Sequence, residues 1–359
     1  MDETLLDLTF VDLLQRTAGY GGFRQSTMET LIGLNSHGYG GIVPHNDDFV
    51  GLSLFTRPRL NLSYNNLSAN RVMSPLLTGE KATYQTYIRN MLDPVGVERN
   101  PDRVCPFFDP KQAFIPLLSN TLLSLSGWPD TVVGTYTSTQ GVYREEWSMV
   151  DDVSKIYNAF DISANFRNIQ GDPISALFTQ WVHYMSGVYE GIMLPHEDCI
   201  QENEKDYETA IYRLIMSPDW EYVHKIGRTI GMPTNVPTGT AFNYDHDRPR
   251  VSDMDQITIN FRCQGAEYND PILIDEFNWV VQEFNPYMRA VTRTSDGTFK
   301  DPTGRLLRIG KEDRKFLNYY GYPMIDPMTG RISWFIEKGV YAQLSGQASN
   351  AYAGIGPAQ

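Results

Sequence analysis

Alternating apolar and polar residues predict strands in the middle of the chain. Within the segment Asp161 to Ile169, the apolar residues Ile162, Ala164 and Phe166 alternate with the polar residues Ser163, Asn165 and Arg167. The same alternation runs from Gln256 to Cys263, and a third strand is predicted from Glu208 to Met216. Successive side chains of a strand point to opposite faces. The pattern therefore predicts a sheet with one face on a core and the other in water.

A helix is predicted directly after the first of these strands. Gly171-Asp172-Pro173 breaks the strand, and Pro173 suits the first turn of a helix. Apolar residues then recur at helical spacing and form one stripe, namely Ile174, Leu177, Phe178, Trp181, Val182 and Met185.

Two of the predicted strands match each other without a gap. Residues 162–167 read ISANFR and residues 257–262 read ITINFR, so each has a polar face with a hydroxyl, an Asn and an Arg. The match has two interpretations. The strands are either amphipathic segments that agree by chance, or two strands of one sheet that present the same wall to water. Both interpretations require a sheet that is covered on one face only.

The rest of the chain gives weaker patterns, from which we predict three parts. The predicted elements are an amphipathic helix at 2–16, flexible or turn-forming glycine segments at 19–22 and 38–41, an extended segment at 49–62, a helix at 83–92, a turn containing Gly231, Pro233 and Pro237, a last strand or short helix at 334–344, and a mobile tail at 345–359. The proline-rich run 93–110 predicts a linker. These patterns divide the chain into an N-terminal extension (1–110), a central β domain (111–285) and a C-terminal extension (286–359).

The charge balance argues against nucleic-acid binding. Asp and Glu number 43 against 30 Lys and Arg, which gives a formal net charge of −13. Such a surface repels phosphates rather than holding them by counterion release, although an acidic wall past which DNA slides remains compatible. The start of the chain lacks the basic cluster of a secretory signal, and its apolar runs fall short of a membrane span. We expect a soluble protein without stable membrane association.

The sequence contains no recognisable catalytic motif. His196 and Cys199 stand three residues apart, but no second pair completes a metal site, and the three cysteines are far apart. The acidic segments 45–48 and 245–247 lack the ligand register of a calcium loop. An acid pair assembled from distant residues stays open. We therefore predict no catalytic residue, no cofactor and no metal site.

The order of features in the central region resembles the tail tube fold of contractile-tailed phages. In that family a strand ending in a Phe-Arg-like pair precedes a helix with a central Trp, as Phe166-Arg167 and Trp181 do here. A later turn of the form aromatic or Met, Pro, three residues, Pro precedes the last strand, as in 232–237. The resemblance covers about half of the chain, from residue 113 to residue 265.

This resemblance implies an α+β fold: a mainly antiparallel β sandwich or barrel of the tail-tube type with one flanking helix, plus N- and C-terminal extensions. It implies that six copies form a ring whose sheets join into one barrel around a channel. The lumen-facing residues would be Ser163, Asn165, Arg167, Thr258, Asn260 and Arg262. The core would consist of Ile162, Phe166, Leu177, Trp181, Ile259 and Phe261. Because the channel must not grip DNA, acidic residues of other strands would have to offset the two arginines.

The function predicted on this basis is that of a virion structural protein, made in the host cytoplasm. It would be a ring-forming component of the tail tube, or of its baseplate or neck end, where the long extensions suit a specialised ring. Expected partners are further copies in a hexamer and adjacent tube, sheath, hub or wedge proteins, with DNA only passing through. The alternatives are another virion part, such as a baseplate wedge or tail terminator, and a soluble metal- or carboxylate-dependent hydrolase with a site at 45–48 or 196–199.

Overall fold

The computed structural model describes residues 50–153, 156–242, 255–294, 298–310, 313 and 320–344. The predicted helix at 2–16, both N-terminal glycine segments, the acidic segments 45–48 and 245–247 and the tail at 345–359 lie outside the described residues.

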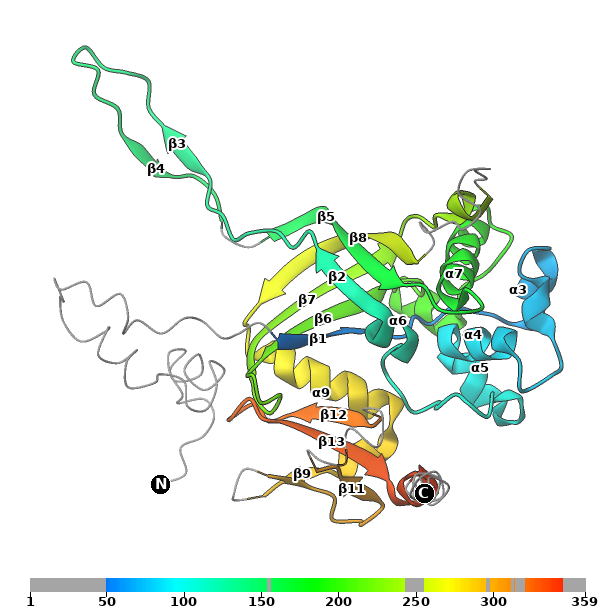
Figure 1. The fold of residues 1–359 in the computed structure, drawn as a ribbon. Coiled ribbons are helices and arrows are strands. Elements are labelled where there is room, and N and C mark those ends of the chain that lie inside the picture. Colours follow the sequence, from blue (N-terminus) through cyan, green and yellow to red (C-terminus); the bar gives the residue numbers. More distant parts are fainter. Residues whose placement is uncertain are drawn as a thin grey trace, which may run out of the picture.

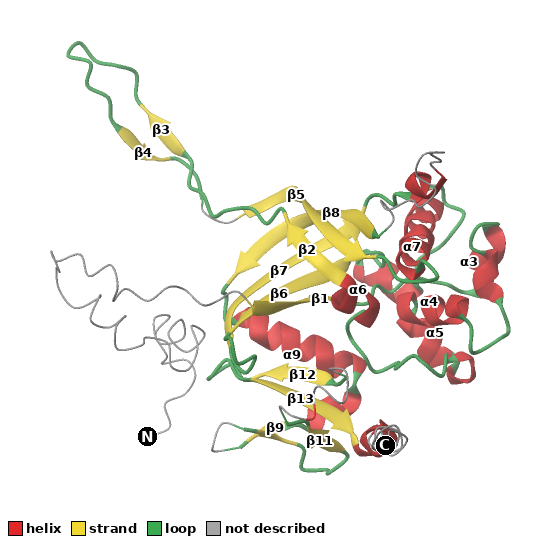
Figure 2. Cartoon of the chain, in the orientation of Figure 1, coloured by secondary structure: helices red, strands yellow, loops and turns green. Residues whose placement is uncertain are grey.

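A six-stranded antiparallel sheet forms the centre of the fold (Figure 1). Its order is β1 (Val50–Phe55), β6 (Thr209–Met216), β7 (Val223–Pro233), β8 (Gln256–Tyr268), β5 (Ile156–Arg167) and β2 (Leu122–Ser126). The sheet curves until it is nearly closed into a barrel, with helices packed around it (Figure 2). The predicted α+β class with a mainly antiparallel sheet is confirmed, as are the predicted strands in β5, β6 and β8.

The two matching sequence segments lie on neighbouring strands. β5 and β8 pair antiparallel, so that Ile162 lies opposite Phe261 and Ala164 opposite Ile259. Opposed residues of a pair point to the same face of a sheet. The two segments therefore share one apolar face and one polar face, as the second interpretation of the match requires.

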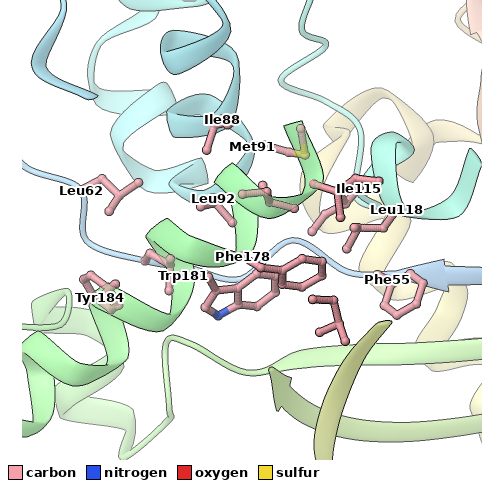
Figure 3. Close-up of a cluster of buried hydrophobic side chains, with 14 of the residues drawn as sticks. Phe55, Leu62, Ile88, Met91, Leu92, Ile115, Leu118, Phe178, Trp181 and Tyr184 are labelled. Atoms are coloured by element: carbon pink, nitrogen blue, oxygen red, sulfur yellow. The ribbon is translucent and has the colours of Figure 1, made fainter. Parts of the chain in front are cut away.

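A first hydrophobic core covers the apolar face of β5 and β8 (Figure 3). The predicted helix is present as α7 (Pro173–Tyr189), and its Phe178 ring contacts the rings of Phe166 and Phe261 at centroid distances of 5.8 Å each. The helices α4 (Tyr84–Leu92) and α6 (Pro116–Thr121) close the core from the other side. All six residues assigned to the core in the sequence are completely buried.

A second hydrophobic core covers the opposite face, at the other end of the sheet. The helix α9 (Ile272–Phe284) and the strands β12 (Tyr322–Ile325), β13 (Ile332–Glu337) and β11 (Leu306–Arg308) pack there against β1, β6 and β7. The Phe277 ring of α9 contacts Tyr212 of β6 at a centroid distance of 5.4 Å. The sheet is thus flanked by a second helix that the sequence pattern did not predict. β1 and β6 contribute to cores on both faces and β7 contributes to the second core, whereas β5 and β8 are covered on one face only.

The proline-rich run 93–110 is an ordered part of the first core rather than a linker. It contains α5 (Pro94–Arg99) and the 3₁₀-helix η3 (Pro101–Arg103), each with proline in its first turn. Val97, Cys105 and Phe108 are buried in this core together with residues of β5 and β8. The packing therefore continues across residue 110, and the division of the chain into three parts stays a prediction.

Shorter elements complete the described chain. These are α3 (Tyr64–Ala69), η2 (Ser74–Leu77), β3 (Thr135–Thr137), β4 (Ser148–Val150), α8 (Glu197–Glu202), η4 (Thr238–Phe242), η6 (Pro286–Ala290), β9 (Thr292–Arg293) and β10 (Phe299–Lys300). The segment predicted as a last strand or short helix holds the end of β13 followed by a helix at 338–344.

The predicted turn around Gly231 and Pro233 begins later than expected. Both residues belong to the end of β7, and only Pro237 lies in the loop that follows. Gly231 is required by packing, because a Cβ there would come within 2.5 Å of the Cys263 sulfur on β8. Pro233 ends the strand, where the loss of a backbone N–H is tolerated. Glycine and proline thus reflect close strand contact and strand termination here, rather than a turn.

A buried guanidinium joins the segment after β1 to the end of α4 and to the segment that leads to α6. Arg57 is 4% exposed and donates hydrogen bonds to the backbone carbonyls of Asn90, Met91, Pro110 and Gln112, at 2.7 to 3.3 Å. Burial lowers the pKa of Arg57 to about 10, so the side chain stays charged at neutral pH. One side chain thereby satisfies carbonyls at the end of α4 and in the segment that leads to α6.

We predict that Arg57→Met lowers the free energy of unfolding by about 3 kcal/mol, because several buried carbonyls lose their donor. Urea denaturation of the purified chain measures this change. The matched control is Arg71→Met at an exposed position, where we expect a change of about 0.5 kcal/mol or less. Equal effects of the two substitutions would contradict the structural role of Arg57.

Candidate functional site

The uncovered polar face of β5 and β8 is the candidate site. It consists of Ser163, Asn165 and Arg167 on β5 and Thr258, Asn260 and Arg262 on β8, the residues that the sequence predicted to face a lumen. Ser163 and Asn165 are partly exposed and the other four are exposed. Neither helix α9 nor the β11–β13 sheet covers this face (Figure 1). The structure thus brings all six residues together on one solvent-facing wall, which we call the polar face.

One of the two arginines of the polar face is paired within the sheet. Arg262 lies opposite Asp161 in the β5–β8 register, and its guanidinium is 3.0 Å from the Asp161 carboxylate. The Asn165 amide donates to the Gln256 side chain at 2.8 Å. Asp161 is therefore the acidic neighbour that an arginine on this face requires. The sequence did not indicate this pair, because the register of two distant strands is not a local property.

The loop after β7 extends the edge of β8 beyond the last paired residue. The Thr234 amide donates to the Asn260 carbonyl at 2.8 Å, and the Asn235 side chain accepts from the Asn260 amide at 2.6 Å. Asn and Thr side chains commonly bond to backbone groups in this way. The loop therefore satisfies backbone groups of β8 at the border of the polar face and holds that border in place.

A long hairpin projects from the sheet between β2 and β5 (Figure 1). Its strands β3 and β4 pair antiparallel, and its described residues are nearly all exposed. The Trp128 ring packs on Tyr268 at its base, and the Tyr268 hydroxyl donates to the Pro129 carbonyl at 2.6 Å. The hairpin thus leaves the sheet from an anchored base. The sequence pattern did not predict it, because apolar residues on an exposed arm follow no burial period.

Comparison with known families matches nearly the whole chain. Residues 6–349 match the family described as "Putative phage tail tube protein". The chain belongs to this family. Among curated proteins, none matches the chain. The polar face, the open sheet and the projecting hairpin are accordingly features of a phage tail tube protein, and its family is one of virion structural proteins rather than of enzymes.

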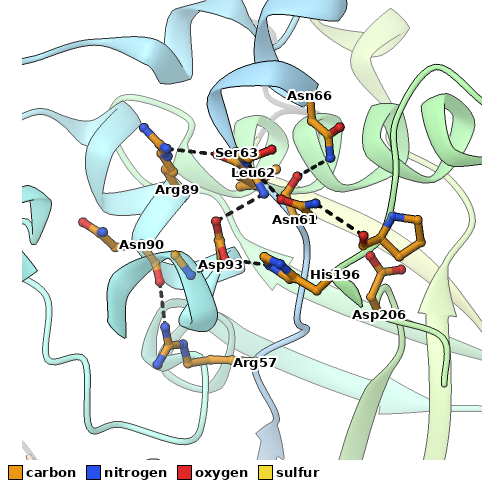
Figure 4. Close-up of polar contacts among 12 residues, drawn as sticks. Arg57, Asn61, Leu62, Ser63, Asn66, Arg89, Asn90, Asp93, His196 and Asp206 are labelled. Carbon is orange, nitrogen blue, oxygen red and sulfur yellow. Dashed lines mark hydrogen bonds and ion pairs between the residues drawn. The ribbon is translucent and has the colours of Figure 1, made fainter. Parts of the chain in front are cut away.

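In this tail tube protein, His196 and Cys199, one of the two places considered for a hydrolase site, are part of the packing. His196 is buried, and its Nε2 lies 3.2 Å from the Asp93 carboxylate, which is also buried (Figure 4). Asp93 accepts in addition from the amides of Leu62 and Gly96 and so caps α5. Burial raises the pKa of the Cys199 thiol, which disfavours the nucleophilic thiolate. His196 and Asp93 therefore join the loop before α8 to the N-terminal part of the first core.

The segment between α8 and β6 is joined to α7 by a second buried polar contact. The Tyr184 hydroxyl donates to the Asp206 carboxylate and accepts from the Asn61 amide at 3.2 Å. Burial raises the pKa of Asp206, while the hydrogen bond from Tyr184 and the proximity of His196 act in the opposite direction. The carboxylate thus holds Tyr184 in the core but is costly to keep ionised.

Neither metal binding nor membrane spanning has a structural counterpart in the described residues. No group of three or more His, Cys, Asp or Glu side chains lies close enough there to hold a metal ion. No helix among them has the length and apolar character needed to cross a bilayer. The absence of cofactors and metals remains a prediction for the chain as a whole.

We predict that Asp206→Asn stabilises the tail tube protein increasingly as the pH rises from about 4 to about 7. A raised carboxyl pKa means that the folded chain holds the proton more tightly than the unfolded chain. The stabilisation from this tighter proton binding is complete below the pKa of Asp206 in the unfolded chain. It is lost as the pH rises through the pKa of Asp206 in the folded chain. Asn removes this loss and can still accept from Tyr184. Urea denaturation across this pH range gives the difference in free energy between variant and wild type, and it should stay constant for exposed Asp151→Asn.

Proposed function

We propose that this protein forms a ring in the phage tail, with the polar face of β5 and β8 lining the channel through which DNA passes. The observation that carries the proposal is the unequal coverage of the sheet. The sheet has a hydrophobic core on both faces at β1 and β6, whereas one face of β5 and β8 is exposed and polar. Such a sheet suits a wall between protein and a water-filled channel.

The charge pattern of the polar face supports passage of DNA without retention. DNA is held by cations that neutralise phosphates and release counterions. Arg262 is paired with Asp161, so this guanidinium is compensated before DNA arrives. The remaining residues of the polar face, apart from Arg167, are uncharged amides and hydroxyls. This face offers few unpaired cations to phosphates, and the net charge of −13 repels them, so the wall does not retain DNA.

The ends of the sheet support assembly with further copies. Among the described strands, β1 and β2 each have one edge without a strand partner. Open edges are sites of pairing with other chains, and a closed ring removes them. Six copies, as the resemblance implies, would join their sheets into one barrel around the channel. We propose a position at the baseplate or neck end, because the chain extends well beyond residues 113–265, with sheath, hub or wedge proteins as further partners.

The first experiment is negative-stain electron microscopy of the purified protein over a concentration series. Sixfold rings or stacked tubes with an open channel are the expected result. Monomers at every concentration would remove the repeating tube subunit from consideration. They would favour another virion part, such as a baseplate wedge or a tail terminator that needs a template.

We predict that Thr258→Cys, on the polar face, reacts with a small maleimide in assembled rings or tubes but is protected from a bulky polymer-bearing maleimide. The unassembled variant should react with both reagents, because Thr258 is exposed in the single chain. The matched control is Tyr189→Cys, which lies at the end of α7 away from the polar face and is 93% exposed in the wild-type side chain. Equal labelling of Thr258→Cys by the two reagents after assembly would contradict a lumen position.

A further inference from the structure

Basic side chains line a small cavity beside helices α4 and α5. The cavity has a volume of about 100 Å³ and is bounded by the segment 77–81, by both helices and by the start of the segment that follows them. Its lining includes Lys81, Arg89 and Arg103, which come from three separate parts of the chain. The volume is several times what one water molecule needs. The cavity therefore has room for a small ligand, and three cationic residues contribute to its wall.

The positive charge of this cavity is not balanced by the carboxylates beside it. Within the described residues, neither the Lys81 ammonium nor the Arg103 guanidinium has an ion-pair or side-chain hydrogen-bond partner. The acidic residues of the lining are Glu80 and Asp93. Asp93 is already engaged, because it caps α5 and contacts His196. The cavity thus keeps an excess of positive charge, although the net charge of the chain is −13.

The partly buried guanidinium of Arg89 has donors to spare. It donates to the Leu62 carbonyl at 2.9 Å and to the Leu76 carbonyl at 3.5 Å. A guanidinium carries five N–H donors, so others remain for a ligand. Burial lowers the pKa of Arg89, Asp93 opposes this shift, and the like charge of Arg103 adds to it. An anion between the two guanidinium groups would relieve their repulsion.

Asn90 adds a buried donor to the same cavity. Arg89 and Asn90 follow one another on α4 (Figure 4). The Asn90 side chain is 5% exposed, and its Oδ1 accepts from the Cys105 amide at 2.9 Å. In the part of the chain that the structure describes, its Nδ2 has no acceptor. Because buried donors nearly always have a partner, a ligand that accepts hydrogen bonds would satisfy this group.

We propose that this cavity binds a phosphate group. Lys81, Arg89 and Arg103 supply positive charge from three segments, and Asn90 supplies an uncharged donor. Guanidinium groups match phosphate oxygens with paired N–H bonds, while a lysine acts as a point charge. Donors on separate segments can reach different oxygens of one tetrahedral ion. The bound group would join the segment 77–81 and α4 to the segment after α5.

This binding site goes beyond the proposed function and does not depend on it. Helices α4 and α5 contribute to the first core, which covers the face of β5 and β8 opposite the polar face (Figure 1). A phosphate group in the cavity therefore lies away from the proposed channel. Each of the two proposals can fail while the other holds.

Isothermal titration calorimetry of the full-length protein with inorganic phosphate tests the site. The buffer is free of phosphate, and sodium chloride keeps the ionic strength constant. We expect binding that saturates at about one phosphate per chain and that raises the resistance of the protein to urea. Absence of binding would overturn the proposal.

Two substitutions separate a specific site from general attraction to cations. We expect Arg103→Gln to weaken phosphate binding at least about tenfold. The matched control is Arg99→Gln, which removes the same charge at an exposed position of α5 outside the cavity lining and should leave binding unchanged. Equal weakening by both substitutions would show that phosphate is attracted without a site.

Asn90→Asp provides a second, independent test. The substitution keeps the size of the side chain and an acceptor for Cys105, but it replaces the buried donor by a carboxylate that repels phosphate. Circular dichroism checks that the variant is folded. We expect its phosphate binding to be lost, and binding as tight as in the wild type would contradict the role of Asn90.

Titration with O-phosphoserine distinguishes the two sources of a phosphate group. Binding of inorganic phosphate alone would support a site for the free ion. Binding of both, with the same response to Arg103→Gln, would support a site that also accepts phosphate monoesters. Binding of neither would overturn the proposal.

Discussion

The structure depends on the unequal coverage of one sheet. β5 and β8 alternate between apolar and polar residues, so one of their faces packs on a core and the other faces water. β6 carries apolar side chains on both faces, with Ile211 in the first core and Tyr212 in the second. The first core, with α7, α4 and α6, therefore covers β1, β6, β8 and β5 on one side. On the other side, α9 and the β11–β13 sheet pack on β1, β6 and β7. This boundary creates the polar face, because no packing layer remains to cover it.

The buried titratable residues Arg57, Asp93 and His196 hold separate segments of the chain together. Arg57 holds four carbonyls of the run 90–112, and Asp93 with His196 joins α5 to the loop before α8. Burying such groups costs desolvation energy, which is offset only by complete hydrogen bonding. The polar interior thus fixes how the N-terminal segments sit on the sheet. In a protein of a tail tube family this fits a rigid building unit, whose exposed surfaces carry the function.

Local patterns in the sequence predicted the elements whose burial is regular. The strand from Asp161 and the helix with Trp181 follow from alternation and helical spacing, and Pro173 marks the helix start. The pairing of Arg262 with Asp161 was not predictable, since it depends on the register between strands about 100 residues apart in the chain. Gly231 was assigned to a turn, but it lies in β7, where its lack of a side chain permits close contact with Cys263 of β8. Helix α9 was not predicted, because its apolar residues pack in a second core on the opposite face of the sheet, which the alternation of β5 and β8 does not indicate.

The polar face and the hairpin differ in how far the sequence reveals them. The polar face follows from the alternation of apolar and polar residues within single strands. The aromatic side chains Tyr136 and Trp147 of the hairpin meet only because β3 and β4 pair. Both rings stay exposed in the described part of the chain. Since large apolar side chains gain free energy when they leave water, these rings favour a contact with another molecule.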